Sequence, residues 1–152
     1  MNTDQFDKAI LRLLQKNNRI TSEELAQKVG LSSSAIQRRL KRLRDEKIIE
    51  ADVSIISPSV VGLEITLIVD VSLERGNSQG LEKFKTSMLK CNEVMQCYYV
   101  TGSFDFILIV NAQSMQHYEA FTNKWLLDNP NVKHFLTHAV MDKVKVGYSV
   151  PI

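Results

Sequence analysis

The chain has 152 residues, of which 44% are hydrophobic, 24% are charged and 7% are aromatic, and its formal net charge is +2. These values are ordinary for a folded globular protein, and they exclude a disordered chain or a general polycation. The N-terminus is polar and acidic, and no run approaches the roughly 20 apolar residues that a membrane-spanning helix needs. We therefore expect a cytoplasmic protein without a signal peptide or a membrane segment.

The positive charge is concentrated in the N-terminal part of the chain. Residues 1–60 contain 11 Lys and Arg against 8 Asp and Glu, whereas residues 61–152 contain 8 against 9. A local basic excess on an otherwise neutral chain favours a polyanionic partner. The two cysteines, Cys91 and Cys97, have neither CxxC nor metal-ligand spacing, and the three histidines form no metal-ligand pattern, so we predict no metal site.

The first 50 residues predict three short helices. Asp4 can cap the first helix. Its apolar stripe consists of Phe6, Ile10, Leu13 and Leu14. Thr21 begins the second helix, with Glu24 at the capping-box position, and Gly30 ends it. Two short helices joined by a glycine turn are the layout of a helix-turn-helix.

The third helix carries five cations and no anion between residues 36 and 44. Ser32 is its expected cap, and Ile36, Leu40 and Leu43 form its buried stripe. The cations fall on the opposite side, so we expect them to project away from the other helices without i,i+4 ion pairs. A basic outer face is often only a solvated surface. Because this helix follows a helix and a glycine turn, we interpret it as one presented to the DNA major groove.

The polar face of the third helix divides into base-contacting and phosphate-contacting candidates. The candidates for base contacts are Ser34, Gln37 and Arg38, and Ser33 in the first turn suits either a base edge or a phosphate. The cations assigned to phosphate are Arg39, Lys41, Arg42 and Arg44. Thr21 and Ser22, at the start of the second helix, can also donate to a phosphate.

After the helices, residues 49–55 alternate between apolar and polar side chains, which predicts a half-buried strand. Together with the three helices this strand indicates a winged helix-turn-helix over residues 1–50, and residues 51–62 form the connection. Residues 63–152 then predict β-α-β twice, with strands at 63–74, 93–100, 106–111 and 132–146. Asn77 or Ser78 is the expected cap of the first helix in this part, and Ser114 caps the second.

Each of these two later helices has an apolar stripe. The first stripe consists of Leu81, Phe84 and Met88, and the second of Met115, Tyr118, Phe121, Trp125 and Leu126. The order of elements is that of a ferredoxin-like βαββαβ domain, so the whole chain is predicted to be an α+β protein. One face of the sheet stays open and rich in Val and Ile, and we expect it to pack on a second copy.

Two stretches resemble a known family. NRITSEELAQKVGLSSSAIQRRLKRLRDEKII is similar to the DNA-binding module of the Lrp/AsnC transcription regulators, although many members have Pro where this chain has Ser33. CYYVTGSFDFILIV resembles the hairpin of the family's second domain, whose turn reads Thr/Ser-Gly-x-x-Asp. The resemblance covers nearly the whole chain. It implies binding to double-stranded DNA, dimers that assemble to octamers, and a free amino acid as effector, with no cofactor.

The resemblance also implies an effector site. Its contacts in the turn would be Thr101, Gly102, Ser103 and Asp105. Those on the last strand, contributed by a neighbouring subunit, would be Thr137, His138 and Val140. From the residues alone a second interpretation of the turn stays open, in which Gly102 only shapes it and Asp105 only anchors it.

Three other functions stay open. The chain could be an architectural DNA-binding protein without an effector, or an adaptor whose basic helix binds an acidic protein. An enzyme on the ferredoxin-like scaffold would rely on Asp105, Tyr98, Tyr99 and His138. No catalytic triad, metal pattern or phosphate loop supports an enzyme, so we assign no catalytic residue.

Overall fold

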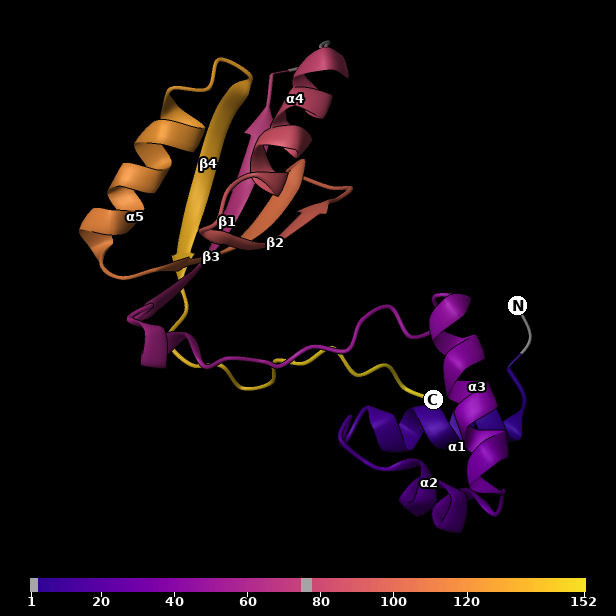
Figure 1. Cartoon of the computed structure of the whole chain (residues 1–152). Coiled ribbons are helices and arrows are strands. Elements are labelled where there is room, and N and C mark those ends of the chain that lie inside the picture. The colour runs from indigo at the N-terminus through magenta and orange to yellow at the C-terminus, as the bar shows by residue number, and fades with distance from the viewer. Residues whose placement is uncertain (1–2, 75–77) are drawn as a thin grey trace. The chain divides into compact units, whose positions relative to one another are not determined.

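The computed structural model describes residues 3–74 and 78–152, and it divides the chain into two compact units (Figure 1). The first unit consists of Met1–Ile55 together with Lys145–Ile152, and the second consists of Ile56–Val144. The division after Ile55 falls inside the predicted connection 51–62. Residues 145–152, which the sequence pattern places in the second domain, group with the first unit instead. None of the helices in the described residues is long and apolar enough to cross a membrane.

The first unit contains α1 (Gln5–Leu14), α2 (Ser22–Val29) and α3 (Ser33–Asp45). All three predicted caps form, because the side chains of Asp4, Thr21 and Ser32 each accept a hydrogen bond from a backbone amide of the first turn. Gly30 ends α2 with a φ of 77°, a backbone conformation that glycine adopts without strain. The buried core of the unit consists of Ile10, Leu25, Ala26, Ile36, Leu40 and Leu43.

One predicted core residue of α1 is wrong. Phe6 is 43% exposed, and its ring lies beneath the guanidinium of Arg39, 5.5 Å from centroid to carbon. The buried position in that turn belongs to Asp7, which is 1% exposed. The physical reason is that Asp7 faces two arginines of α3, so a polar network occupies the place where the apolar stripe predicts a phenylalanine.

The predicted strand over residues 49–55 is also wrong. Residues 50–57 have no regular secondary structure, and Val53 and Ile55 are 68% and 77% exposed. A strand needs a hydrogen-bonded neighbour, and no segment among the described residues pairs with this one. Residues 49–55 therefore alternate between apolar and polar side chains without forming the strand of a wing in the single chain.

The second unit has the predicted ferredoxin-like order of elements. Its strands are β1 (Ile65–Leu73), β2 (Val94–Tyr99), β3 (Phe106–Ala112) and β4 (Val132–Ala139). Its helices are α4 (Ser78–Leu89) and α5 (Met115–Thr122), with a short η1 (Pro58–Val61) before β1 and a π-helical continuation of α5 at η2 (Asn123–Leu127). The sheet has the order β2-β3-β1-β4, and every neighbouring pair is antiparallel.

Alternate residues of the two central strands form the core of this unit. Leu67, Val69 and Val71 of β1 are fully buried, and they pack in one cluster with Phe84 of α4 and Phe121 of α5. Both helices therefore cover the same face of the sheet (Figure 1).

The predicted starts of the two helices of this unit are confirmed only in part. Met115 is 56% exposed, so its predicted place in the core is wrong; it begins α5 one turn before the first buried residue, Tyr118. Ser114 caps α5 as predicted. For α4, Asn77 lies outside the described residues, and Ser78 is already the first helical residue.

The last strand ends earlier than predicted, at Ala139 rather than at residue 146. Ala139 pairs with Leu67, and the amide of Val140 donates to the carbonyl of Thr66 at 3.0 Å. Because β1 begins at Ile65, later residues of the chain have no strand to pair with.

The final residues lie against α1 in the first unit. The side-chain amide of Gln15 donates to the Val150 carbonyl at 3.1 Å, and it accepts a hydrogen bond from the Val150 amide at 2.6 Å. Arg12 Nε donates to the carbonyl of Ile152 at 2.6 Å. The first unit is therefore assembled from two separate segments of the chain.

Candidate DNA-binding helix and ligand hollow

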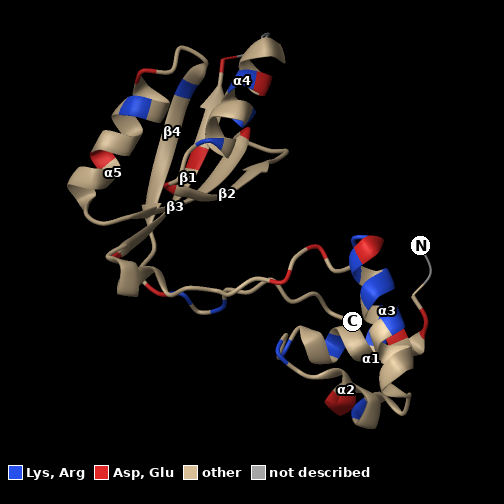
Figure 2. Cartoon of the chain, in the orientation of Figure 1, with Lys and Arg blue, Asp and Glu red and all other residues tan. Residues whose placement is uncertain are grey.

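Four polar side chains form one exposed face of α3. Ser34, Gln37, Arg38 and Lys41 are all exposed, and their i, i+3, i+4, i+7 spacing places them in one row. Lys and Arg gather along this helix in Figure 2. In the described parts of the chain no carboxylate forms an ion pair with Arg38. Lys41 Nζ lies 2.5 Å from Asp45, but both side chains are largely exposed, so the pair contributes little.

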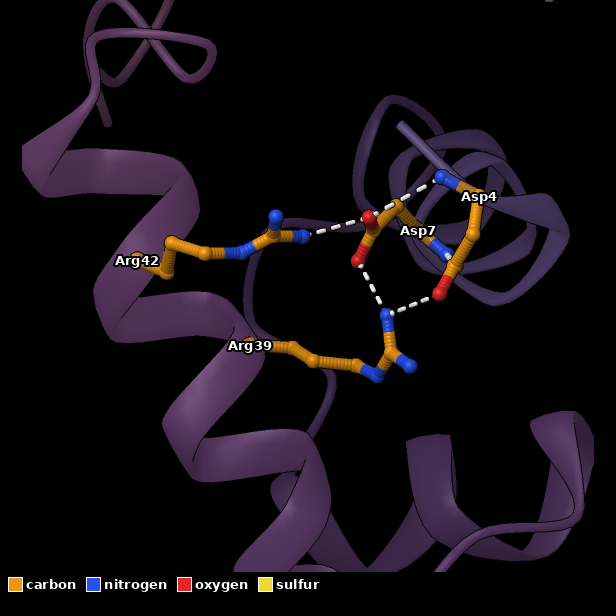
Figure 3. A network of polar contacts seen from close by, with 4 residues as sticks. All are labelled: Asp4, Asp7, Arg39 and Arg42. Atoms are coloured by element: carbon orange, nitrogen blue, oxygen red, sulfur yellow. Dashed lines mark hydrogen bonds and ion pairs between the residues drawn. The ribbon is translucent and has the colours of Figure 1, made fainter. Parts of the chain in front are cut away.

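Two of the predicted phosphate contacts turn inward. Arg39 Nη1 donates to Asp4 Oδ2 and to Asp7 Oδ1, both at 2.7 Å, and Arg42 Nη2 donates to Asp7 Oδ2 (Figure 3). The expectation that every cation of α3 projects away from the other helices is therefore wrong for Arg39 and Arg42. It is wrong because their acidic partners lie more than 30 residues earlier, outside any helical spacing.

The expectation that the basic face lacks ion pairs is wrong as well. Besides the Lys41–Asp45 pair, Arg44 donates to both carboxylate oxygens of Asp52, at 2.8 and 3.3 Å. Asp45 and Asp52 follow the basic run in the sequence, so the absence of acids inside the run did not exclude pairing.

The Asp7 carboxyl is charged at neutral pH despite its burial. Burial alone would raise its pKa, but hydrogen bonds from Arg42 and Arg39 outweigh that effect and hold the pKa below its ordinary value of 3.8. The backbone amide of Asp7 likewise lowers the pKa of Asp4. This network joins the first turn of α1 to α3.

The remaining DNA-binding candidates lie near the two helix starts. Thr21 Oγ1 accepts from the Glu24 amide at 3.2 Å, which leaves the hydroxyl hydrogen available to a phosphate. Ser22 and Ser33 are half-buried first residues of α2 and α3. Ser34 Oγ lies 3.2 Å from Ser32 Oγ.

The turn at residues 101–105 is anchored to the end of β1. Gly102 has a φ of 127°, as the predicted turn requires. Asp105 Oδ2 accepts from the Leu73 amide at 2.7 Å, and the Asp105 amide donates to the Val71 carbonyl at 2.9 Å. Asp105 thus makes the contacts expected if its role is to anchor the turn.

A hollow of about 560 Å³ lies beside this turn, which is a suitable volume for a small molecule. Three of the four predicted effector residues of the turn, Gly102, Ser103 and Asp105, line it, whereas Thr101 does not. Charged and titratable groups that the sequence interpretation missed also line it, namely Glu74, Lys133 and His134. They come from the end of β1 and the start of β4, so no local spacing connects them to the turn.

The three predicted residues of the last strand do not line this hollow. Thr137 faces the helices, where its hydroxyl lies 2.5 Å from that of Tyr118. His138 faces the open side of the sheet, with Nε2 2.9 Å from Asp70 Oδ2. Val140 lies just beyond the end of β4. Within one chain the structure therefore does not bring the two predicted groups of effector residues together.

The open face of the sheet is apolar around the His138–Asp70 pair. Ile68 and Ile107 are half-buried there, and Leu136 and Tyr98 are 49% and 52% exposed. In the described residues no element of this chain covers that face. Nor do any three His, Cys, Asp or Glu residues among them form a group that could hold a metal ion.

The first unit is a helix-turn-helix whose α3 has an exposed polar face, and the second is an α+β domain with a hollow. This combination is typical of a DNA-binding regulator with a ligand-binding domain. Two family models match these parts. Residues 3–50 match a winged helix-turn-helix DNA-binding domain, and residues 66–150 match the Lrp/AsnC ligand-binding domain. The chain belongs to the Lrp/AsnC family of transcriptional regulators.

Individual relatives agree with this assignment. The chain is 55% identical over 152 residues to a helix-turn-helix transcriptional regulator of Sinorhizobium fredii, covering all of this chain and 90% of that protein. It is 32% identical over 142 residues to the leucine-responsive regulatory protein of Escherichia coli, covering 93% and 87%. A crystal structure of a Neisseria meningitidis transcriptional regulator with L-methionine has a TM-score of 0.93 at 32% identity, covering 99% and 97%.

Proposed function

We propose that this regulator binds specific DNA sequences and that a free amino acid, with no other cofactor, controls its assembly and its DNA binding. The observation that carries the proposal is the hollow beside residues 101–105, which is lined by acidic and basic groups together. An amino acid has one charge of each sign on its backbone, so such a lining matches its chemistry. The similar Neisseria regulator was crystallised with L-methionine, which supports the same class of ligand.

Each charge of the ligand has a counterpart in the hollow. Lys133 and the backbone amides of Gly102 and Ser103 suit the α-carboxylate, because a glycine turn exposes its N–H groups. Glu74 suits the α-ammonium group and is the better candidate than Asp105, because Asp105 already accepts the Leu73 amide.

The proposal includes a homodimer that forms through the open face of the sheet. Isoleucines and Leu136 would lose their contact with water there, and self-pairing of one surface is the usual way in which dimers form. Further assembly of dimers, up to an octamer, would bring Thr137, His138 and Val140 of one subunit near the hollow of another. A ligand that prefers one assembly shifts the population toward it, and so changes how many α3 helices reach DNA together.

On DNA, the exposed row of α3 is the proposed reading surface. Ser34, Gln37 and Arg38 would contact base edges, and Lys41 would contact a phosphate. Thr21 and Ser22 would add a phosphate contact at the start of α2.

The test is a thermal-shift screen of the full chain against the twenty amino acids, followed by gel-shift assays on DNA upstream of its own gene. At least one amino acid should raise the melting temperature of the wild type. Glu74→Gln should reduce that shift, whereas Glu119→Gln, an exposed residue of α5, should keep it. A screen in which no amino acid raises the melting temperature would refute the effector and favour an architectural DNA-binding protein.

A further inference from the structure

We infer that Asp7 is a positioning residue for DNA recognition: it holds Arg39 and Arg42 against α1, so that these two arginines do not contact DNA and Arg38 and Lys41 remain as the cations of the exposed row of α3. The inference rests on the proposed role of α3 as the DNA-reading helix. Asp7 lies in α1, the helix that precedes the helix-turn-helix. Its carboxylate occupies Arg39 and Arg42, the two arginines that the sequence pattern assigns to phosphate contacts.

The first argument is the geometry of the carboxylate. Asp7 is 1% exposed, and it accepts hydrogen bonds from Arg39 Nη1 at 2.7 Å, from Arg42 Nη2 and from the Asp4 amide at 3.2 Å. Figure 3 shows Arg39 and Arg42 reaching from successive turns of α3 toward the same carboxylate. Two contacts one turn apart on α3 oppose rotation of this helix about its own axis, because such a rotation would pull both guanidinium groups away from the carboxylate.

The second argument is the cost of moving an arginine away. The Asp7 carboxylate is buried, whereas the side chains of Arg39 and Arg42 are 26% and 39% exposed, so taking a donor away costs most on the side of the carboxylate, whose charge is then less well compensated. A DNA phosphate would have to displace Asp7 from Arg39 or Arg42 and leave that carboxylate with fewer donors. Arg38 has no carboxylate partner in the described residues, and the Lys41–Asp45 pair is exposed and weak, so both are available without such a cost.

Salt dependence of DNA binding counts the cations that meet phosphate, because each such contact releases a counterion. An arginine already neutralised by Asp7 would not add to that count. The number of phosphate contacts therefore distinguishes a positioning network from two free arginines, and a purely structural role of Asp7 would not change it.

The experiment measures binding of the full chain to a fluorescein-labelled 30-base-pair duplex of mixed sequence, by anisotropy, over a range of salt concentrations. Asp7→Asn should make the slope of log affinity against log salt steeper by about 0.9 to 1.8 per bound subunit, because one or two arginines are released to phosphate. Asp45→Asn removes the same negative charge from an exposed pair and should leave the slope at the wild-type value.

Equal slopes for Asp7→Asn and Asp45→Asn would overturn the inference. If Asp7→Asn does not fold, Arg42→Gln provides the test instead. This variant is expected to fold because Asp7 keeps Arg39 as a partner. Arg42→Gln should not change the slope, and a slope shallower by about 0.9 would overturn the inference. A wild-type chain that binds neither this duplex at low salt nor DNA upstream of its own gene would refute the proposed function itself, so the two failures are distinguishable.

Discussion

Replacing Leu43 with alanine should destabilise the first unit and leave the second unit folded. Leu43 is fully buried in α3, where it packs in one cluster with Ile10, Leu25 and Ile36. The buried cluster of the second unit shares no residue with this one. A cavity at Leu43 therefore removes apolar contacts from one core only.

The expected size of the effect follows from burial. Leu→Ala at a fully buried site costs about 2–5 kcal/mol, and we take about 3 kcal/mol for Leu43. The first unit has roughly 60 residues, so its whole free energy of unfolding is on the order of 3–9 kcal/mol. For a domain of this size the loss should lower the melting temperature of the first unit by about 12–24 °C.

Differential scanning calorimetry of the full chain is the measurement. Leu43→Ala should lower one transition, and the matched variant Leu108→Ala, at a fully buried site of β3, should lower the other. Leu43→Ala should also lose DNA binding while any amino-acid-induced stabilisation of the second unit persists. If both variants lower a single shared transition by the same amount, the reasoning from two separate cores is wrong.

Three further predictions concern pH, assembly and the turn. Because the pKa of Asp7 is lowered in the folded state, its ion pairs stabilise the first unit above about pH 4 and are lost as the pH falls through the folded-state pKa. Acid should therefore lower the melting temperature of the first unit, and it should do so less in Asp7→Asn. Leu136→Asp on the open sheet face should give monomers in analytical ultracentrifugation, whereas Glu119→Gln should not. Gly102→Ala should lower the free energy of unfolding of the second unit by about 1–3 kcal/mol in denaturant unfolding, because the φ of Gly102 is positive. The cost is backbone strain and not a clash, since an added Cβ meets no atom within 4 Å. The control Gly147→Ala, at a glycine without a positive φ, should be neutral.

Local signals made much of the fold predictable from the sequence. Asp4, Thr21, Ser32 and Ser114 cap the helices that they were expected to cap, because a cap bonds to an amide only a few residues away. The central strands follow from their alternation, because one face of each strand is buried.

The features that the sequence did not reveal depend on residues far apart in the chain. Residues 49–55 have the alternation of a strand, but a strand also needs a neighbour, and β4 ends where β1 no longer supplies one. Asp7 was not recognised because its partners Arg39 and Arg42 lie on another helix. The charged lining of the hollow, such as Glu74 and Lys133, likewise comes together only when the sheet has formed.

The contact between Gln15 and Val150 has a consequence for how the protein is made. A ribosome synthesises α1, α2 and α3 first, then all of residues 56–144, and only afterwards the segment that lies on α1. Until that segment has been made, the side-chain amide of Gln15 and the guanidinium of Arg12 cannot form these hydrogen bonds. The unit that emerges first from the ribosome is therefore the last to gain its full set of contacts.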